Sequence, residues 1–219
     1  MQPKIKIILV DDHPIFRQGL QVLIEEQKNF EVVAVAGDGR TTLQLARDLS
    51  PDVIVMDITM PELNGIEATR AILQEMPAIK IIALSIHHNR IFIEEMLNAG
   101  AMGYVLKSCA FEELVLAIES ICNGKQYLSE KIKCFIESIS ENDDFENMIT
   151  AIQPLTPREK EVLQLIAEGK TSKEISHLLN ITLKTVEKHR HAIKEKLNIH
   201  STAQLTKFAI QSSLTNLEI

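Results

Sequence analysis

The feature that most limits how this chain can fold is an alternation of short apolar runs with amphipathic segments between Lys4 and Asn123. Apolar residues fill nearly every position of the central runs, which is typical of parallel strands covered by helices on both faces. We therefore predict an α/β doubly wound domain with a parallel five-stranded sheet, whose functional loops follow the carboxyl ends of the strands. The expected strands are KIKIILV, EVVAVA, DVIVMD, KIIALSI and MGYVLK, and the expected helices are Ile15–Glu26, Thr41–Leu49, Gly65–Glu75, Asn89–Asn98 and Phe111–Cys122.

The chain beyond Asn123 follows a different pattern. Residues 124–153 contain one expected helix, Ser129–Ile139, and then the acidic run ENDDFEN, which is typical of a solvated linker. From Pro154 onward the pattern is helical only, and capping boxes start at Thr156 and Thr171. We expect a first domain at residues 1–123, a linker at 124–153 and a small all-α domain at 154–219. The apolar residues expected in its core are Leu163, Ile166, Ile175, Leu178, Leu179, Leu183, Val186, Ile193 and Leu197.

Charge is distributed unevenly along the chain. The net charge of −7 divides into −7 for residues 1–122, −3 for residues 123–153 and +3 for residues 154–219. This asymmetry favours a polyanionic partner for the last segment alone. No apolar run reaches the roughly 18 residues that cross a bilayer, so we expect no membrane contact. The three cysteines are odd in number and lack metal-type spacing, which is typical of a reducing, cytoplasmic compartment.

Polar residues gather where the predicted strands end. Asp11 and Asp12 follow the first strand and Asp57 ends the third, and these two strands are neighbours in a doubly wound sheet. Close carboxylates repel one another unless a cation intervenes, and hard oxygen ligands suit Mg²⁺. Ser85 and Lys107 end the fourth and fifth strands and add a hydroxyl donor and a positive charge. This arrangement suits phosphoryl transfer to a carboxylate. Taken singly, each residue has an ordinary explanation, because such aspartates often cap helices and such lysines are often solvated.

The third helix of the C-terminal segment is basic on its expected exposed face. Between Lys170 and Lys196 there are seven Lys or Arg residues and three Glu residues. Such a helix can enter the major groove of DNA, although a solvated helix with the same charges is the alternative. We expect phosphate contacts from Lys173, Lys184, Arg190 and Lys194 and base-edge contacts from Glu187, Lys188 and His191. Thr185 is expected on the same exposed face, as a further DNA-binding residue.

The motifs LVDDHP, VIVMDITMPELNG, IIALS and GYVLK resemble the receiver domain of bacterial two-component response regulators, over roughly residues 4–122. The resemblance implies that Asp57 is the phosphoacceptor and that Asp11, Asp12 and the backbone carbonyl of Thr59 are Mg²⁺ ligands. It implies a switch hydroxyl at Ser85, a phosphate-binding Lys107 and a switch aromatic at Tyr104, which would fill space that Ser85 vacates. Tyr104 as a simple core aromatic is the alternative.

The motifs LTPRE, EGKTSKEIS and TVEKHR followed by KL resemble the LuxR/NarL-type helix-turn-helix output domain, over residues 154–215. The resemblance implies a structural role for Glu159 and a dimer contact for the fourth helix, and it implies that His189 is structural. Many members of that family have lysine where Glu187 stands here.

The sequence therefore indicates a response regulator of the NarL/FixJ type, and not an enzyme. A sensor histidine kinase would phosphorylate Asp57 with Mg²⁺, and the phosphorylated homodimer would bind double-stranded DNA and regulate transcription. Two alternatives stay open. One is a Mg²⁺-dependent phosphatase with an aspartyl nucleophile, and the other is an adaptor whose C-terminal domain binds protein.

Overall fold

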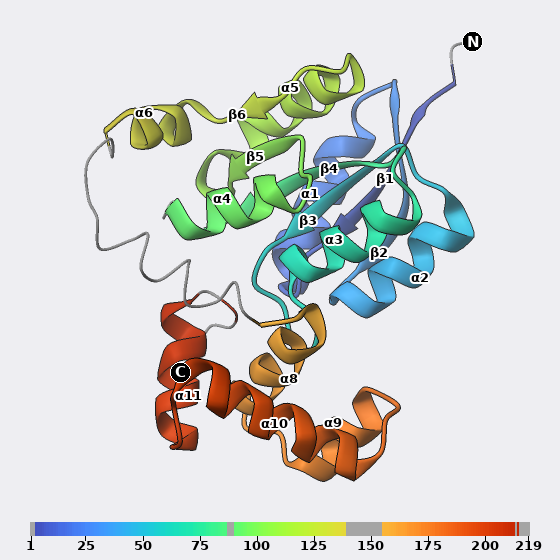
Figure 1. The fold of residues 1–219 in the computed structure, drawn as a ribbon. Helices are drawn as coiled ribbons and strands as arrows, with labels where there is room; N and C mark the ends of the chain where they lie inside the picture. Colours follow the sequence, from blue (N-terminus) through green and yellow to red (C-terminus); the bar gives the residue numbers. More distant parts are fainter. Residues whose placement is uncertain (1–2, 87–89, 139–154, 213, 215–219) are drawn as a thin grey trace. The chain divides into compact units, whose positions relative to one another are not determined.

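The computed structural model describes residues 3–86, 90–138, 155–212 and 214, and the chain divides into two compact units, Met1–Ser140 and Glu141–Ile219 (Figure 1). The expected acidic linker run at residues 141–147 and the expected helical residue Asn89 lie outside the described residues. No described helix is long and apolar enough to cross a membrane.

The first unit contains a parallel sheet in the order β2-β1-β3-β4-β5-β6. This confirms the predicted doubly wound α/β class. Its strands are β1 (Ile5–Val10), β2 (Phe30–Ala36), β3 (Val53–Asp57), β4 (Lys80–Ser85), β5 (Gly103–Leu106) and β6 (Tyr127–Leu128). Its helices are α1 (Pro14–Glu25), α2 (Gly39–Leu49), α3 (Gly65–Glu75), α4 (Arg90–Asn98), the short 3₁₀ helix η1 (Lys107–Cys109), α5 (Ala110–Cys122) and α6 (Glu130–Ser138).

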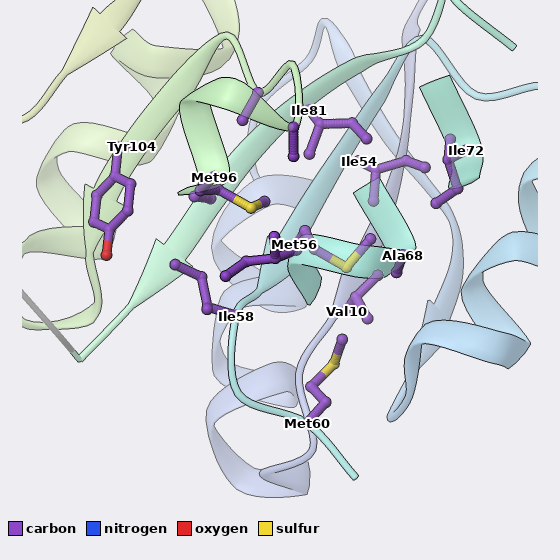
Figure 2. Packing of buried hydrophobic residues seen from close by; sticks show 14 of the residues in the cluster. Val10, Ile54, Met56, Ile58, Met60, Ala68, Ile72, Ile81, Met96 and Tyr104 are labelled. Carbon is purple, nitrogen blue, oxygen red and sulfur yellow. The ribbon is translucent and has the colours of Figure 1, made fainter. Parts of the chain in front are cut away.

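Two apolar clusters fill the two faces of the sheet, because successive side chains of each strand point to opposite sides. Along β1, Ile7 and Leu9 belong to the cluster that α1 and α5 cover, whereas Ile8 and Val10 belong to the cluster with α2, α3 and α4. Figure 2 shows part of the second cluster, in which Val10 lies with residues of β3 and α3. With helices on both faces, the carboxyl ends of β1, β3, β4 and β5 remain as the edge where side chains can meet a ligand.

The sheet has six strands, so the prediction of five was wrong. Tyr127 and Leu128 pair with β5, and the backbone N–H of Ser129 donates to the Tyr104 carbonyl oxygen at 3.0 Å. The helix expected at Ser129–Ile139 is present as α6 (Glu130–Ser138), and its Ile132 is 0% exposed within the cluster that contains Tyr104. A strand of two residues is too short to show any alternation in the sequence, which is why it was missed.

The second unit is the expected helical bundle, and its described helices are α8 (Pro157–Ala167), α9 (Ser172–Leu178), α10 (Leu183–Leu197) and α11 (Thr202–Gln211). Both predicted capping boxes form, at Thr156 with Glu159 and at Thr171 with Glu174. The expected apolar residues pack into one cluster with a single exception. Leu183 is 51% exposed, so its assignment to the buried face of α10 was wrong. Leu183 is the first residue of α10, and at this end of the helix its side chain lies outside the core.

Candidate functional site

Three carboxylates meet at the carboxyl edge of the sheet. Asp11 and Asp12 directly follow β1, Asp57 is the last residue of β3, and the two strands are paired through Val10 and Met56. Asp57 is 1% exposed. Ligand-capable atoms of the three aspartates and of His13 all lie within 4.8 Å of one another. The structure thus brings together the acidic residues that the sequence predicted to converge.

Lys107 provides the positive charge of this cluster. It begins η1 directly after β5, and its Nζ donates to Asp57 Oδ2 at 2.6 Å and lies 2.8 Å from Asp11 Oδ2. Its side chain is 10% exposed. Burial alone would lower the pKa of Lys107, but the charges of Asp57 and Asp11 outweigh burial and raise it. Lys107 is therefore held as a cation between two carboxylates.

Asp57 differs from an ordinary surface aspartate in its electrostatics. Burial, which the attraction of Lys107 only partly offsets, together with the repulsion of Asp11 raises the pKa of Asp57 to about 7. Its second oxygen, Oδ1, is buried and has no hydrogen-bond partner among the described residues. An oxygen in this condition is available to a cation or to an incoming electrophile. The hard oxygen donors and the unpartnered Oδ1 fit Mg²⁺.

Ser85 and Tyr104 lie beside this cluster on the neighbouring strands. Ser85 ends β4 next to the end of β3, and Tyr104 lies on β5. Both side chains are buried, and a hydrogen bond joins the Tyr104 hydroxyl to the Ser85 side chain. Burial raises the pKa of the Tyr104 hydroxyl, so it stays protonated. The sequence predicted that Tyr104 fills space that Ser85 vacates, with a simple core aromatic as the alternative. In this structure Tyr104 is already buried, at 0% exposed, and belongs to the cluster that Figure 2 shows.

His13 is a member of the cluster that sequence reasoning did not include. Its Nδ1 lies 2.7 Å from Asp12 Oδ1 and 3.1 Å from Asp11 Oδ1, and its backbone N–H donates to Asp11 Oδ1 at 2.8 Å. The available signal was its position directly after the acidic pair. Thr59, expected to offer its carbonyl, is partly buried in the loop two residues beyond Asp57.

The raised pKa of Asp57 leads to a stability prediction for the metal-free chain. Between its ordinary pKa of 3.8 and about 7, the folded chain holds a proton that the unfolded chain releases, so stability falls as the pH rises through this range. Asp57→Asn has no charge to bury. Urea unfolding in EDTA should show that, from about pH 4 to about pH 8, the wild-type chain loses more free energy of unfolding than the variant. We expect a difference above about 1 kcal/mol, as one pKa unit is worth about 1.4 kcal/mol. Parallel pH profiles would contradict it.

The residues expected to contact DNA lie on α9 and α10. Lys173, on α9, is exposed, and so are Lys184, Glu187, Lys188 and His191 on α10. Thr185, Arg190 and Lys194 are partly buried. Thr185 also belongs to the helix start, because its backbone N–H donates to the hydroxyl of the N-cap residue Thr182 at 3.2 Å. The exposed side chains of α10 named above therefore lie on its accessible side, whereas Val186 and Ile193 belong to the core.

Glu159 lies in the interior of the helical unit. Its Oε2 accepts a hydrogen bond from Lys196 Nζ at 2.7 Å and from the Thr156 backbone N–H at 2.7 Å. Burial would raise the pKa of Glu159, but these hydrogen bonds outweigh it and lower the pKa. The carboxylate thus joins α8 to the end of α10, which is a structural contact.

Comparison with known proteins covers both units. Residues 7–119 match the response regulator receiver domain, and residues 153–209 match the bacterial regulatory proteins of the luxR family. The chain is 37% identical to the transcriptional regulatory protein MctR of Rhizobium johnstonii, over 98% of this chain and 97% of MctR. It is 39% identical to the transcriptional regulatory protein LiaR of Bacillus subtilis, over 97% of this chain and all of LiaR, 100%.

Among solved structures, the response regulator RcsB in complex with DNA is similar to this chain. The TM-score is 0.61 and the sequence identity is 27%, and the match covers 97% of this chain and 100% of RcsB. RcsB has also been solved as two dimers bound to two parallel DNAs. The two domain matches follow the order of the two structural units, and the relatives are similar over nearly their whole length. The receiver match includes the acidic cluster at the carboxyl edge of the sheet. This chain therefore belongs to the NarL/FixJ family of two-component response regulators, which carry a receiver domain and a LuxR-type helix-turn-helix and regulate transcription by binding DNA.

Proposed function

We propose that Asp57 is the residue through which this response regulator is controlled. A phosphohistidine of a sensor histidine kinase, or a small donor such as acetyl phosphate, would transfer its phosphoryl group to Asp57. The observation that carries this proposal is the asymmetry of the Asp57 carboxylate. Oδ2 is held by Lys107 at 2.6 Å, whereas Oδ1 is buried and unpartnered among the described residues.

In the proposed step a carboxylate oxygen of Asp57 forms a bond to phosphorus. The bond between phosphorus and the donor's nitrogen or oxygen breaks, and its electron pair leaves with the donor. Lys107 would then follow the negative charge from the carboxylate to the new phosphoryl oxygens. Mg²⁺, when bound, would neutralise charge on the transferring oxygens. Asp11, Asp12, Asp57 and the Thr59 carbonyl would hold it, which suits the close packing of carboxylates in the cluster.

Signal output from the site would begin at Ser85. Ser85 is hydrogen-bonded to Tyr104 in this structure. We propose that phosphorylation of Asp57 makes Ser85 exchange this partner for the phosphoryl group. The Ser85 hydroxyl would donate to a phosphoryl oxygen and release the Tyr104 hydroxyl. Tyr104 then has to find a new partner or change its packing within the cluster around α4 and β5, and the surface of these elements would change with it.

For the output, we propose that phosphorylation favours a homodimer whose two α10 helices occupy successive major-groove half-sites. RcsB, a similar protein, has been solved as dimers on DNA. The test uses the full chain with Mg²⁺, with and without beryllofluoride, a mimic of the phosphoryl group. DNA is first selected from a random pool, and gel filtration and binding are then compared. Beryllofluoride should increase both the dimer fraction and the affinity, and no change in either would overturn the proposal.

Two lysines of the helical unit should respond differently to substitution. Lys194→Ala should weaken binding to all DNA sequences alike and flatten the dependence on salt, because it would remove one phosphate contact. Lys188→Ala should relax discrimination at one base pair, with a cost of about 1–3 kcal/mol for the preferred base. Binding to the selected site and to single-base variants, each at several salt concentrations, measures both effects. The division of roles is refuted if the two substitutions act identically.

A further inference from the structure

The ammonium group of Lys107 has a third neighbour besides its two carboxylates. The ring of Phe16 lies beneath it, with Nζ 5.3 Å from the ring centroid. Phe16 is in the first turn of α1, shortly after the acidic pair, and packs against the cluster that α1 and α5 form with the sheet. A cation within about 6 Å of a ring face is attracted by the ring's negative quadrupole, and more strongly where water is excluded.

The Phe16 ring is itself held by a second aromatic side chain. Phe111, at the start of α5, lies with its ring centroid 6.1 Å from that of Phe16, and the ring planes are inclined at 55°. Tilted pairs at this distance are favourable. The two rings join the first turn of α1 to the first turn of α5, on the side of the sheet where Lys107 emerges. Phe111 is itself 54% exposed, whereas the Lys107 side chain is only 10% exposed.

We infer that Phe16 is a positioning residue for Lys107 in phosphoryl transfer. Before transfer, Asp57 Oδ2 and Asp11 Oδ2 draw the ammonium toward the carboxylates, at 2.6 Å and 2.8 Å. Once Asp57 carries the phosphoryl group as an acyl phosphate, its negative charge lies farther out on the phosphoryl oxygens, and Lys107 has to follow. The quadrupole of Phe16 does not change in this step. The ring therefore keeps the ammonium within the pocket in both states and offers no anion that competes with phosphate. This inference rests on the proposed phosphorylation of Asp57.

Three substitutions separate positioning from packing. Phe16→Leu keeps an apolar side chain but removes the ring, and Phe16→Tyr keeps the ring. Phe30→Leu is the matched control, because Phe30 belongs to the same apolar cluster but lies at the opposite end of β2 from the site. With acetyl phosphate and Mg²⁺, Phe16→Leu should be labelled about 3- to 10-fold more slowly than wild type. Phe16→Tyr should be within about twofold of wild type, and so should Phe30→Leu.

A spectroscopic measurement tests the contact without reference to phosphorylation. The ring should shift the ε-methylene proton signals of Lys107 upfield of those of other lysines, and Phe16→Leu should remove this shift while Phe30→Leu leaves it. The wild-type spectrum alone tests the contact if Phe16→Leu does not fold. Unshifted signals in the wild type would overturn the inference, and so would equal slowing by Phe16→Leu and Phe30→Leu. An absence of labelling in the wild type would overturn the proposed function, whereas the proton shift would still report on Phe16.

Discussion

Asp57→Asn is expected to abolish phosphorylation of the chain by acetyl phosphate and Mg²⁺, with labelling reduced by about three orders of magnitude or more. The variant keeps nearly the same shape and an oxygen that can accept from Lys107, but an amide lacks the anionic oxygen that attacks phosphorus. Asp57 is the last residue of a central strand, contacts the Lys107 ammonium through Oδ2, and has a buried Oδ1 without a hydrogen-bond partner among the described residues. Mass spectrometry of the intact chain measures the gain of a phosphoryl group.

Asp52→Asn is the matched control for this experiment. Asp52 immediately precedes β3, at the opposite end of the strand from Asp57, and accepts a hydrogen bond from the Lys6 backbone N–H at 2.8 Å. An asparagine can accept the same hydrogen bond, so this variant should be labelled like the wild type. Full labelling of Asp57→Asn would move the acceptor elsewhere, first to Asp11, whose carboxylate also lies against Lys107.

Gly65→Ala is expected to destabilise the first unit by about 3 kcal/mol or more. Gly65 begins α3, and its backbone N–H donates to the Ile58 carbonyl oxygen at 2.8 Å, which draws the start of the helix against the end of β3. A Cβ at this position would lie 2.0 Å from the Asp57 carbonyl oxygen. The obstacle is backbone and cannot rotate away, so the loop between β3 and α3 has to move, and the position of Asp57 with it. Chemical denaturation measures the loss, and the phosphorylation rate should fall as well.

Gly19→Ala provides the opposite case. Gly19 lies inside α1, and the nearest atom to a Cβ added there is the edge of the Phe111 ring at 4.0 Å, an ordinary contact. Alanine should therefore stabilise the helix by about 0.5–1 kcal/mol, because it restricts the unfolded chain. Equal and small effects at both glycines would show that the junction between β3 and α3 tolerates a side chain.

The prediction from sequence succeeded where a regular pattern continued over many residues. The fully apolar runs identified the central strands, and the rule that parallel strands end at one edge predicted that Asp11, Asp57 and Lys107 lie close together. The capping boxes at Thr156 and Thr171 located two helix starts, because a hydroxyl and a glutamate three residues later satisfy the free backbone N–H groups.

The features that sequence reasoning missed depend on contacts between distant residues. A two-residue strand has no periodicity, and the hydrogen bond between Tyr104 and Ser85 joins residues of two different strands. Leu183 has the right spacing for a core residue, but its place at the first turn of α10 leaves it exposed. The contact between the Phe16 ring and the Lys107 ammonium forms because α1 and α5 pack on the same face of the sheet, which the sequence does not show directly.

The sixth strand changes where the chain can be cut for separate study. A receiver fragment that stopped at Asn123 would leave the outer edge of β5 bare, and unpaired edges of this kind promote aggregation. It would also uncover the apolar surface beneath Ile132 and take away the N–H that Ser129 supplies to the Tyr104 carbonyl. Such a fragment would alter the surroundings of Tyr104, the residue that is proposed to respond to phosphorylation of Asp57. An isolated receiver therefore has to extend through Ser138, the end of α6.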